Sequence, residues 1–305
     1  MSSAEPTERQ PLASVRVTRS VAVRLGVVST ASFFWSVALL GVVLEVITGR
    51  ALEPITVVAS SPLELLVGVL FVIVLLVLVV VPHELLHGLA MTRYGAAPSY
   101  GVGVSGFVRP HAYVQSSELA FTRNQLLVIL LIPFVVITAT GLVLLAVVQS
   151  PLLLVPIAAN VAGSVSDLWM AAAILRYPSS ARIAGLPTDR GQGLAVYDAA
   201  SRRSSRRRSL ERRLAAFVTG AAVTFTLLVF GLFTVVVTSL IVGSGDVVLG
   251  DPGGTWFLLR HELDPDEYAV SVELGGPVLV ASSTLGGLAW AAGSAVVHAV
   301  SRAES

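Results

Sequence analysis

Six apolar blocks, each about as long as a bilayer requires, alternate with polar segments along the chain. A helix needs about 20 apolar residues to cross the hydrocarbon core. Inside a bilayer the backbone must satisfy its own hydrogen bonds, so we expect every block to be helical. The blocks run from Leu25 to Thr48, Leu63 to Met91, Gln125 to Val148, Leu152 to Leu175, Leu214 to Val242 and Pro277 to Val300. The pattern predicts an all-α integral membrane protein with about six transmembrane helices.

Composition supports this interpretation and limits the chemistry that the chain can support. Hydrophobic residues make up 54% of the chain and charged residues only 13%, against about 25% charged residues in a typical soluble domain. The chain contains no cysteine. Disulfides are therefore excluded, and a transition-metal site has only His, Asp, Glu and water as strong ligands.

The placement of arginine predicts the orientation. Basic residues favour the cytoplasmic loops of membrane proteins. With the N-terminus inside, all of the 20 basic residues fall in inner segments except Arg50 and Arg260. The last outer loop, Ser244 to Gly276, is acidic. We therefore expect a multi-pass protein of the cell membrane with both termini in the cytoplasm, and we interpret the polar N-terminal stretch as a tail rather than a cleaved signal peptide.

These features divide the chain into four expected regions. Residues 1–24 form a cytoplasmic tail, 25–176 the membrane core, 177–212 a basic cytoplasmic linker, and 213–305 a C-terminal membrane region with the acidic outer loop. The linker ends in "SRRSSRRRSLERR". Such a run is either a solvated anchor or a binding surface for anionic lipid headgroups, which attract each arginine by about 1 kcal/mol. No aromatic residues interleave it, so we do not expect nucleic-acid binding.

The loop after the second block predicts a short β-hairpin. Apolar and polar residues alternate in "SYGVGVSGFV" and again in "HAYVQ", which is typical of strands. We place the turn near Arg109 and Pro110, with a plain connecting loop as the alternative. "GVGVSG" fits the dinucleotide pattern G-x-G-x-x-G, but the required flanking strand and helix are missing. An exposed edge of the hairpin is instead a surface to which an extended substrate segment can add.

The second block ends in the sequence "VVVPHELLHGLA", which contains an H-E-x-x-H motif at His83, Glu84 and His87. Positions i and i+4 share one helix face, so both imidazoles reach one ion. Catalytic zinc has three protein ligands and one water. The ion lowers the pKa of that water to about 7, and the neighbouring glutamate acts as general base. The motif therefore predicts a Zn²⁺ site with Glu84 as the catalytic residue.

Depth in the membrane identifies Asp167 as the third ligand. His87 lies about 9 Å and His83 about 15 Å from Arg93 at the inner edge, at 1.5 Å rise per residue. By the same rise, Asp167 lies about 14 Å from Arg176. The two blocks run in the same direction, so the three side chains occupy one layer. A hydrogen bond from Asp167 to a neighbouring helix is the alternative. The other candidate ligands fall in loops or at the end of the last block: His111, Glu118, His261 and His298.

Three segments resemble a known family. "HELLHGL", "FTRNQLLVILLIPF" and "NVAGSVSDLW" are similar to the DUF3267 family of putative membrane zincin metallopeptidases, which resembles the site-2 proteases. The resemblance covers about residues 63 to 178. It implies zinc held by His83, His87 and Asp167, with Glu84 as the base of intramembrane proteolysis.

The function that we expect is hydrolysis of peptide bonds near the cytoplasmic face, with a membrane protein or peptide as substrate. The alternative is a non-proteolytic membrane protein that binds zinc for a structural or sensory role. A metal transporter is less favoured, because no further polar residues line a path through the outer half of the spans.

Overall fold

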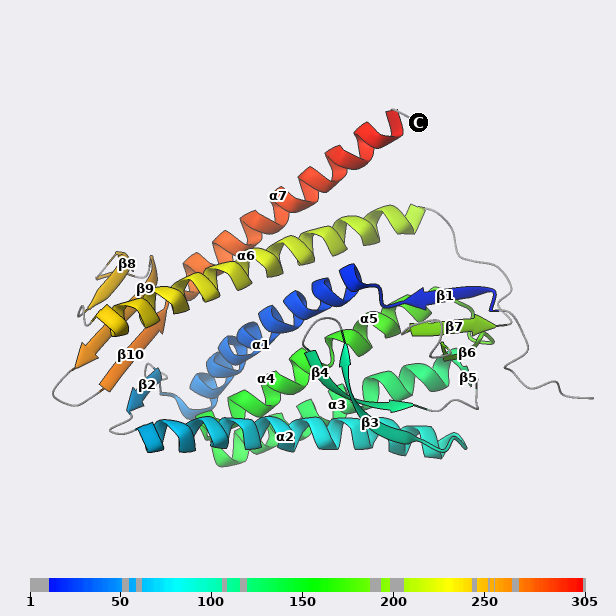
Figure 1. The fold of residues 1–305 in the computed structure, drawn as a ribbon, viewed down its shortest axis with the longest axis horizontal. Helices are drawn as coiled ribbons and strands as arrows, with labels where there is room; N and C mark the ends of the chain where they lie inside the picture. The colour runs from blue at the N-terminus through cyan, green and yellow to red at the C-terminus, as the bar shows by residue number, and fades with distance from the viewer. Residues whose placement is uncertain are drawn as a thin grey trace, which may run out of the picture. The chain divides into compact units, whose positions relative to one another are not determined.

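Six helical segments of the computed structural model are long and apolar enough to cross a membrane (Figure 1). The structure describes residues 11–50, 55–58, 62–105, 109–115, 120–186, 193–197, 206–242, 246–251, 253–254, 256–264 and 269–303. The six segments are α1 (Arg19–Thr48), α2 (Pro62–Arg93), α3 (Arg123–Val148), a broken fourth made of η2 (Pro151–Leu153), α4 (Leu154–Gly163) and α5 (Val165–Ile174), then α6 (Arg206–Val242) and α7 (Gly276–Ala303). The predicted helical architecture is confirmed.

The chain forms two compact units. The first comprises Met1–Ser29 and Leu75–Ser205, and the second comprises Thr30–Val74 and Arg206–Ser305. All the residues predicted to bind zinc lie in the first unit.

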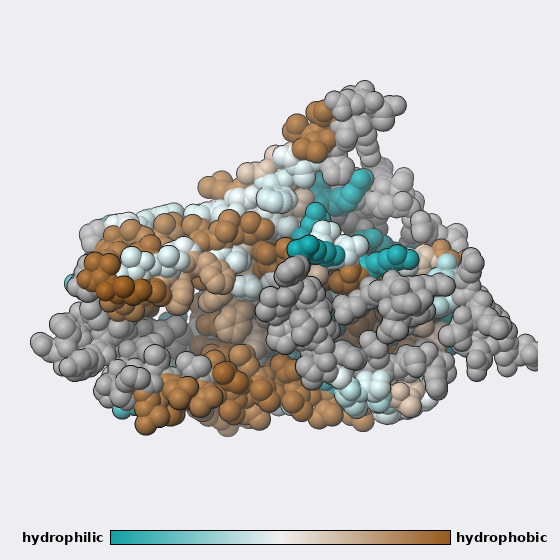
Figure 2. Space-filling model, in the orientation of Figure 1, coloured by the Kyte–Doolittle hydropathy of each residue, from teal (hydrophilic) through white to brown (hydrophobic). Residues whose placement is uncertain are grey.

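Helix α2 is apolar around most of its circumference, which is typical of a membrane span. Figure 2 shows apolar side chains covering its outer face, and Leu78 and Leu85 are more than half exposed. Pro62 is its first residue, where a missing N–H leaves no helical bond unmade. Arg93 is its last, and Gly95 follows with a φ of +84°, a left-handed conformation that glycine adopts without strain.

Helix α3 begins at a capping box. The Thr122 hydroxyl accepts from the Gln125 N–H at 3.3 Å, and the Gln125 side chain accepts from the Thr122 N–H at 2.9 Å. This reciprocal pair satisfies two N–H groups that a helix start leaves without partners. The helix ends where Gln149 takes a left-handed conformation, with φ of 53°. The "TRNQ" sequence therefore fixes where α3 starts.

The fourth span is broken at Ser164. The Ser164 hydroxyl donates to the Asn160 carbonyl at 2.8 Å, and the Ser164 N–H donates to the same oxygen at 2.9 Å. Serine bonds of this kind bend helices. The break lets α5 begin a new first turn, which contains Asp167.

A four-stranded antiparallel sheet in the first unit connects the start of α3 to the end of α5. Its order is β1 (Ala13–Arg16), β7 (Gly193–Tyr197), β6 (Arg182–Gly185) and β5 (Phe121–Thr122). Strand β5 directly precedes α3, and β6 follows α5. The Arg123 guanidinium also donates to the Tyr177 carbonyl at 2.9 Å. Strands β1, β6 and β7 lie within the expected tail and linker, where the sequence predicted no strands.

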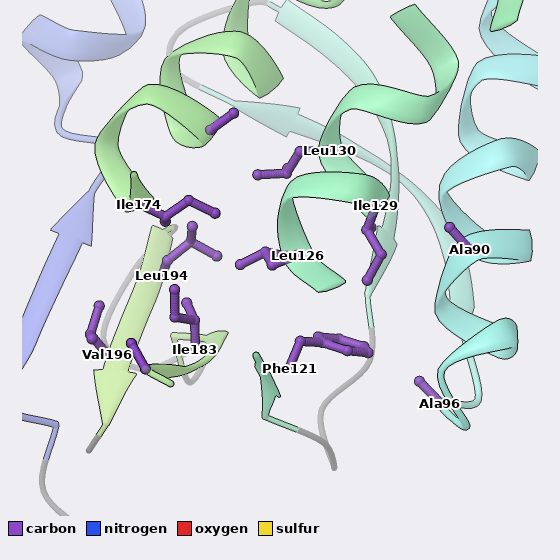
Figure 3. Packing of buried hydrophobic residues seen from close by; sticks show 12 residues of the cluster. Ala90, Ala96, Phe121, Leu126, Ile129, Leu130, Ile174, Ile183, Leu194 and Val196 are labelled. Carbon is purple, nitrogen blue, oxygen red and sulfur yellow. The ribbon is translucent and has the colours of Figure 1, made fainter. Parts of the chain in front are cut away.

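The core of the first unit lies between α3, α5 and this sheet (Figure 3). Leu126 and Leu130 of α3 face Ile174 of α5, with strands β6 and β7 below them. Strands β6 and β7 contribute three completely buried side chains to this core: Ile183, Ala195 and Val196. Their burial explains why these strands pair with each other rather than remaining in solvent. Burial of such side chains contributes about 1.5–3 kcal/mol each.

The predicted hairpin is present as β3 (Ser99–Ser105) and β4 (Arg109–Gln115). Ser105 pairs with Arg109, so Arg109 and Pro110 belong to the second strand and not to the turn. Tyr100 of β3 packs against Gly88 of α2, where any Cβ would collide with its ring. The hairpin therefore starts beside the helix that carries the H-E-x-x-H motif.

The second unit contains a helical hairpin and a four-stranded sheet that the sequence did not predict. The sheet is antiparallel, in the order β2 (Ile55–Val58), β10 (Ala269–Leu274), β9 (Phe257–Asp264), β8 (Val247–Gly250). Helices α6 and α7 approach closely because Gly220 lies against Trp290. Helix α6 begins at Arg206, earlier than the predicted Leu214, so the final arginines of the linker are helical.

Candidate metal centre

Two segments that are far apart in the sequence bring three ligand side chains together. His83 and His87 lie one turn apart on α2, and Asp167 lies in the first turn of α5. One ligand atom from each lies within 4.8 Å of the others. All three side chains are buried, with exposed fractions of 8%, 6% and 8%. The structure therefore brings together the three residues that the sequence selected as metal ligands.

The distances from Asp167 to the two histidine nitrogens are compatible with a tetrahedral metal site. Asp167 Oδ2 lies 3.2 Å from His83 Nε2 and 3.5 Å from His87 Nε2. Zinc bonds to nitrogen and oxygen are about 2.1 Å long, so two ligands of a tetrahedral zinc are about 3.4 Å apart. The imidazole rings stand nearly perpendicular, at 78° with centroids 4.9 Å apart.

A backbone carbonyl determines the tautomer of His87. His87 Nδ1 lies 2.7 Å from the carbonyl oxygen of Ile129 in α3. Because a carbonyl only accepts, Nδ1 must carry the proton and donate. In the neutral ring, the lone pair is then on Nε2, which faces Asp167.

Asn160 determines the tautomer of His83 in the same way. The Asn160 amide nitrogen donates to Thr138 Oγ1 at 3.1 Å and to the Phe134 carbonyl at 3.5 Å. This assigns the amide oxygen to the other side, where it lies 3.1 Å from His83 Nδ1 and accepts from it. His83 Nε2 therefore also faces Asp167 with its lone pair. Asn160 is almost completely buried.

The chemistry of this donor set suits a metal cation. Two neutral imidazoles would direct lone pairs at a carboxylate oxygen 3.2 and 3.5 Å away, in a buried site. Such an arrangement is repulsive unless a positive charge lies among the three atoms. Neutral histidine nitrogens and an ionised carboxylate are ligands that zinc prefers, and each histidine donates its other N–H to a supporting acceptor, as is usual for metal ligands. The residues present therefore fit zinc.

The start of α5 contributes to the position and charge of Asp167. The break at Ser164 places Asp167 in the first turn of a helix. The partial positive charge of a helix N-terminus stabilises a carboxylate there by about 0.3–1 kcal/mol. An unbroken span would place Asp167 in mid-helix, without this contribution.

Glu84 follows His83 on α2 and is half-buried, unlike the two histidines on either side of it in the motif. It is therefore adjacent in the chain to one of the three candidate ligands and still accessible to a small molecule. This combination suits a group that exchanges protons with water.

The alternative ligands are not part of this cluster as far as the structure describes them. His261 is completely buried in β9, in the second unit. Glu118 lies outside the described residues. His111 lies in β4 and His298 in α7, but their side chains lie outside the described part of the chain.

The sequence selects the three residues that cluster here but does not predict the groups that hold the two histidines. These groups are Asn160, Thr138 and the Ile129 carbonyl. A proline at position 133, four residues after Ile129, was the one signal in the sequence, because proline leaves the carbonyl four residues before it without a helical donor.

Comparison with known proteins supports the zinc assignment. Residues 75–182 match the family DUF3267, described as "Putative zincin peptidase". The matched segment holds His83, Glu84, His87, Asn160 and Asp167, so the resemblance to this family is confirmed. Comparison with curated proteins and with solved structures finds no significant match.

Proposed function

We propose that the chain is a membrane-embedded zinc metallopeptidase that hydrolyses peptide bonds near the cytoplasmic face, related in mechanism to the site-2 proteases. The observation that carries the proposal is the convergence of His83, His87 and Asp167, with every ligand nitrogen aimed by a second hydrogen bond. The zincin description of the matched family supports it independently.

Three residues would bind the metal, and Glu84 would act as the general base. His83, His87 and Asp167 would hold the zinc. Bound zinc supplies a Lewis acid that polarises a carbonyl and activates water. Glu84 takes a proton from the water as its oxygen attacks the carbonyl carbon. It then gives that proton to the amine nitrogen as the C–N bond breaks.

The ligand count favours catalysis over a structural role. Structural zinc sites are almost always closed by four protein ligands, whereas catalytic sites use three. The cluster in the described part of the chain offers three. A structural or sensory zinc protein would also have no use for Glu84 beside the cluster.

We infer the placement in the cell membrane from the six apolar helices and from the distribution of arginine. Helix α6 begins with Arg206 and also carries Arg212 and Arg213 ahead of its apolar stretch. We expect these arginines to lie at the cytoplasmic surface and to attract anionic lipid headgroups.

The substrate that we propose is a membrane protein or peptide whose cleaved segment unwinds to an extended chain near the metal centre. The hairpin β3–β4 is a two-stranded sheet, so each strand has an edge at which an extended chain can add. Its first strand lies against α2 at Gly88, next to His87.

Substitution of Glu84 tests the proposal. The purified full-length chain would be reconstituted in liposomes with a library of transmembrane peptides that carry a fluorophore and a quencher. Glu84→Gln should retain zinc and lose hydrolysis by at least about 100-fold, within the range for general base catalysis. Glu64→Gln, the same change at the exposed far end of α2, should leave both unchanged. Retained zinc with undiminished hydrolysis in Glu84→Gln would contradict the peptidase assignment.

A further inference from the structure

Helix α3 contains a proline in its middle, and this proline leaves one buried carbonyl without a helical partner. In an α-helix the N–H of residue i donates to the carbonyl of residue i−4. Pro133 has no N–H, so it cannot donate to the carbonyl of Ile129. Pro133 and Ile129 are both almost completely buried. A buried carbonyl with no partner is unfavourable, so this oxygen needs a donor from another part of the chain.

The donor is His87. Its Nδ1–H lies 2.7 Å from the Ile129 oxygen, at the short end of the range for N–H···O bonds. The proline ring also pushes the carbonyl four residues earlier away from the helix axis, because the two would otherwise clash. The oxygen that Pro133 leaves free is therefore also turned toward a neighbour.

We propose that Pro133 is the positioning residue for His87: by removing one helical hydrogen bond, it reserves the Ile129 carbonyl for the His87 ring. The reserved oxygen keeps the proton on Nδ1 and directs Nε2 to Asp167. The proposal rests on the metal centre described above. Pro133 is not itself one of the candidate metal ligands.

The other mid-helix proline shows that the effect depends on position. Pro82 of α2 also lacks an N–H and leaves the Leu78 carbonyl without a helical donor. Leu78, however, has an exposed fraction of 62%, so it lies on the outer face of the helix. The carbonyl in α3 lies instead at one of the most deeply buried positions of the first unit, Ile129, at 1% exposure.

Substitution of Pro133 by alanine restores the missing donor. The N–H of residue 133 then competes for the Ile129 oxygen and draws it back along the helix axis. We expect the zinc dissociation constant to rise about tenfold, at the lower end of the range for loss of a group that supports a ligand. Alanine is the best helix former, so the variant should fold. Pro156→Ala is the matched control, because Pro156 lies in the first turn of α4, where N–H groups lack helical partners anyway.

The hydrogen bond of His87 Nδ1–H is the readout, because a general structural role would not change it selectively. NMR of histidine-labelled, zinc-loaded, full-length chain in detergent should show the His87 Nδ1–H proton of the wild type shifted downfield, as expected for a short hydrogen bond to the Ile129 oxygen. In Pro133→Ala this proton should move upfield, because the N–H of residue 133 competes for the same oxygen. His83, which is held by Asn160, should be unchanged and serves as the reference in the same spectrum.

Two results would overturn the proposal. One is unchanged zinc affinity together with an unchanged His87 Nδ1–H signal. The other is an equal change at His83 and His87, which would indicate distortion of the whole centre. Failure of the peptidase assignment would be seen separately, in the Glu84→Gln experiment, because neither zinc affinity nor the Nδ1–H signal depends on hydrolysis.

Discussion

Replacement of Asn160 by leucine should weaken zinc binding by one to two orders of magnitude. Leucine has a similar size but offers no acceptor to His83 Nδ1, which now donates to Asn160 Oδ1 at 3.1 Å. Without metal, the ring can rotate or move its proton to the other nitrogen. With zinc bound to Nε2, the His83 ring can neither rotate nor move its proton. The unsatisfied Nδ1–H therefore raises the free energy of the zinc-bound state and weakens binding.

The magnitude follows from the burial of the donor. His83 and Asn160 have exposed fractions of 8% and 1%, so water cannot replace the lost acceptor. A buried donor left without a partner costs about 1–3 kcal/mol. At 1.4 kcal/mol for each factor of ten, this is roughly 5- to 140-fold in the dissociation constant. The typical cost of removing a group that supports a metal ligand, about 10- to 100-fold, lies within that range.

Competition with a chelator of known affinity, on the full-length chain in detergent, measures the change. Asn160→Asp keeps an acceptor for His83 and should bind zinc within a few-fold of the wild type. Asn124→Leu makes the same change at an exposed position on α3 and should have no effect. If Asn160→Leu binds zinc as tightly as the wild type, the hydrogen bond from His83 Nδ1 to Asn160 does not support zinc binding, and our assignment is wrong.

Three further outcomes are expected. Metal analysis should find about one zinc per wild-type chain and little in Asp167→Ala; equal contents would exclude Asp167 as a ligand. Gly220→Ala adds a methyl group against Trp290 and should lower the free energy of unfolding by about 1–3 kcal/mol. Gly231→Ala, at an open position on the same helix, should not, and thermal unfolding in detergent distinguishes the two. Val104→Pro, in β3, should abolish peptide cleavage with zinc retained, and unchanged turnover would rule out substrate addition to that strand.

The sequence predicted the helices and the approach of His83, His87 and Asp167 because both depend on simple geometry. Long apolar blocks allow only helices, and the constant helix rise placed Asp167 at the depth of His83. The three side chains cluster as expected because α2 and α5 both stay helical through these residues.

The sheets were missed because their strands are short and pair across long separations. Phe121 pairs with Ile183 and Ala13 with Val196, and no local pattern reveals such partners. The strand β6 contributes only four residues, too few for alternation to stand out in a polar segment.

The supports of the histidines were missed for a different reason. The acceptor of His87 is the backbone carbonyl oxygen of Ile129. Because every residue has such an oxygen, the side chain at position 129 does not reveal that this one binds a histidine. Only a proline four residues later distinguishes that oxygen from its neighbours. The acceptor of His83 is the Asn160 side chain, which lies 77 residues away in the sequence, so no local pattern joins the two.

The pairing of β5 with β6 limits where the chain can tolerate insertions. Thr122 pairs with Arg182, immediately before the helix that supplies the Ile129 carbonyl and shortly after the helix that carries Asp167. One residue inserted within α5 after Asp167 would move the carboxylate by about 1.5 Å along the axis, whereas metal–ligand distances hold to within about 0.2 Å. The length of α5 after Asp167 is therefore a fixed dimension of the candidate metal centre, and indels within that helix should be as damaging as loss of a ligand.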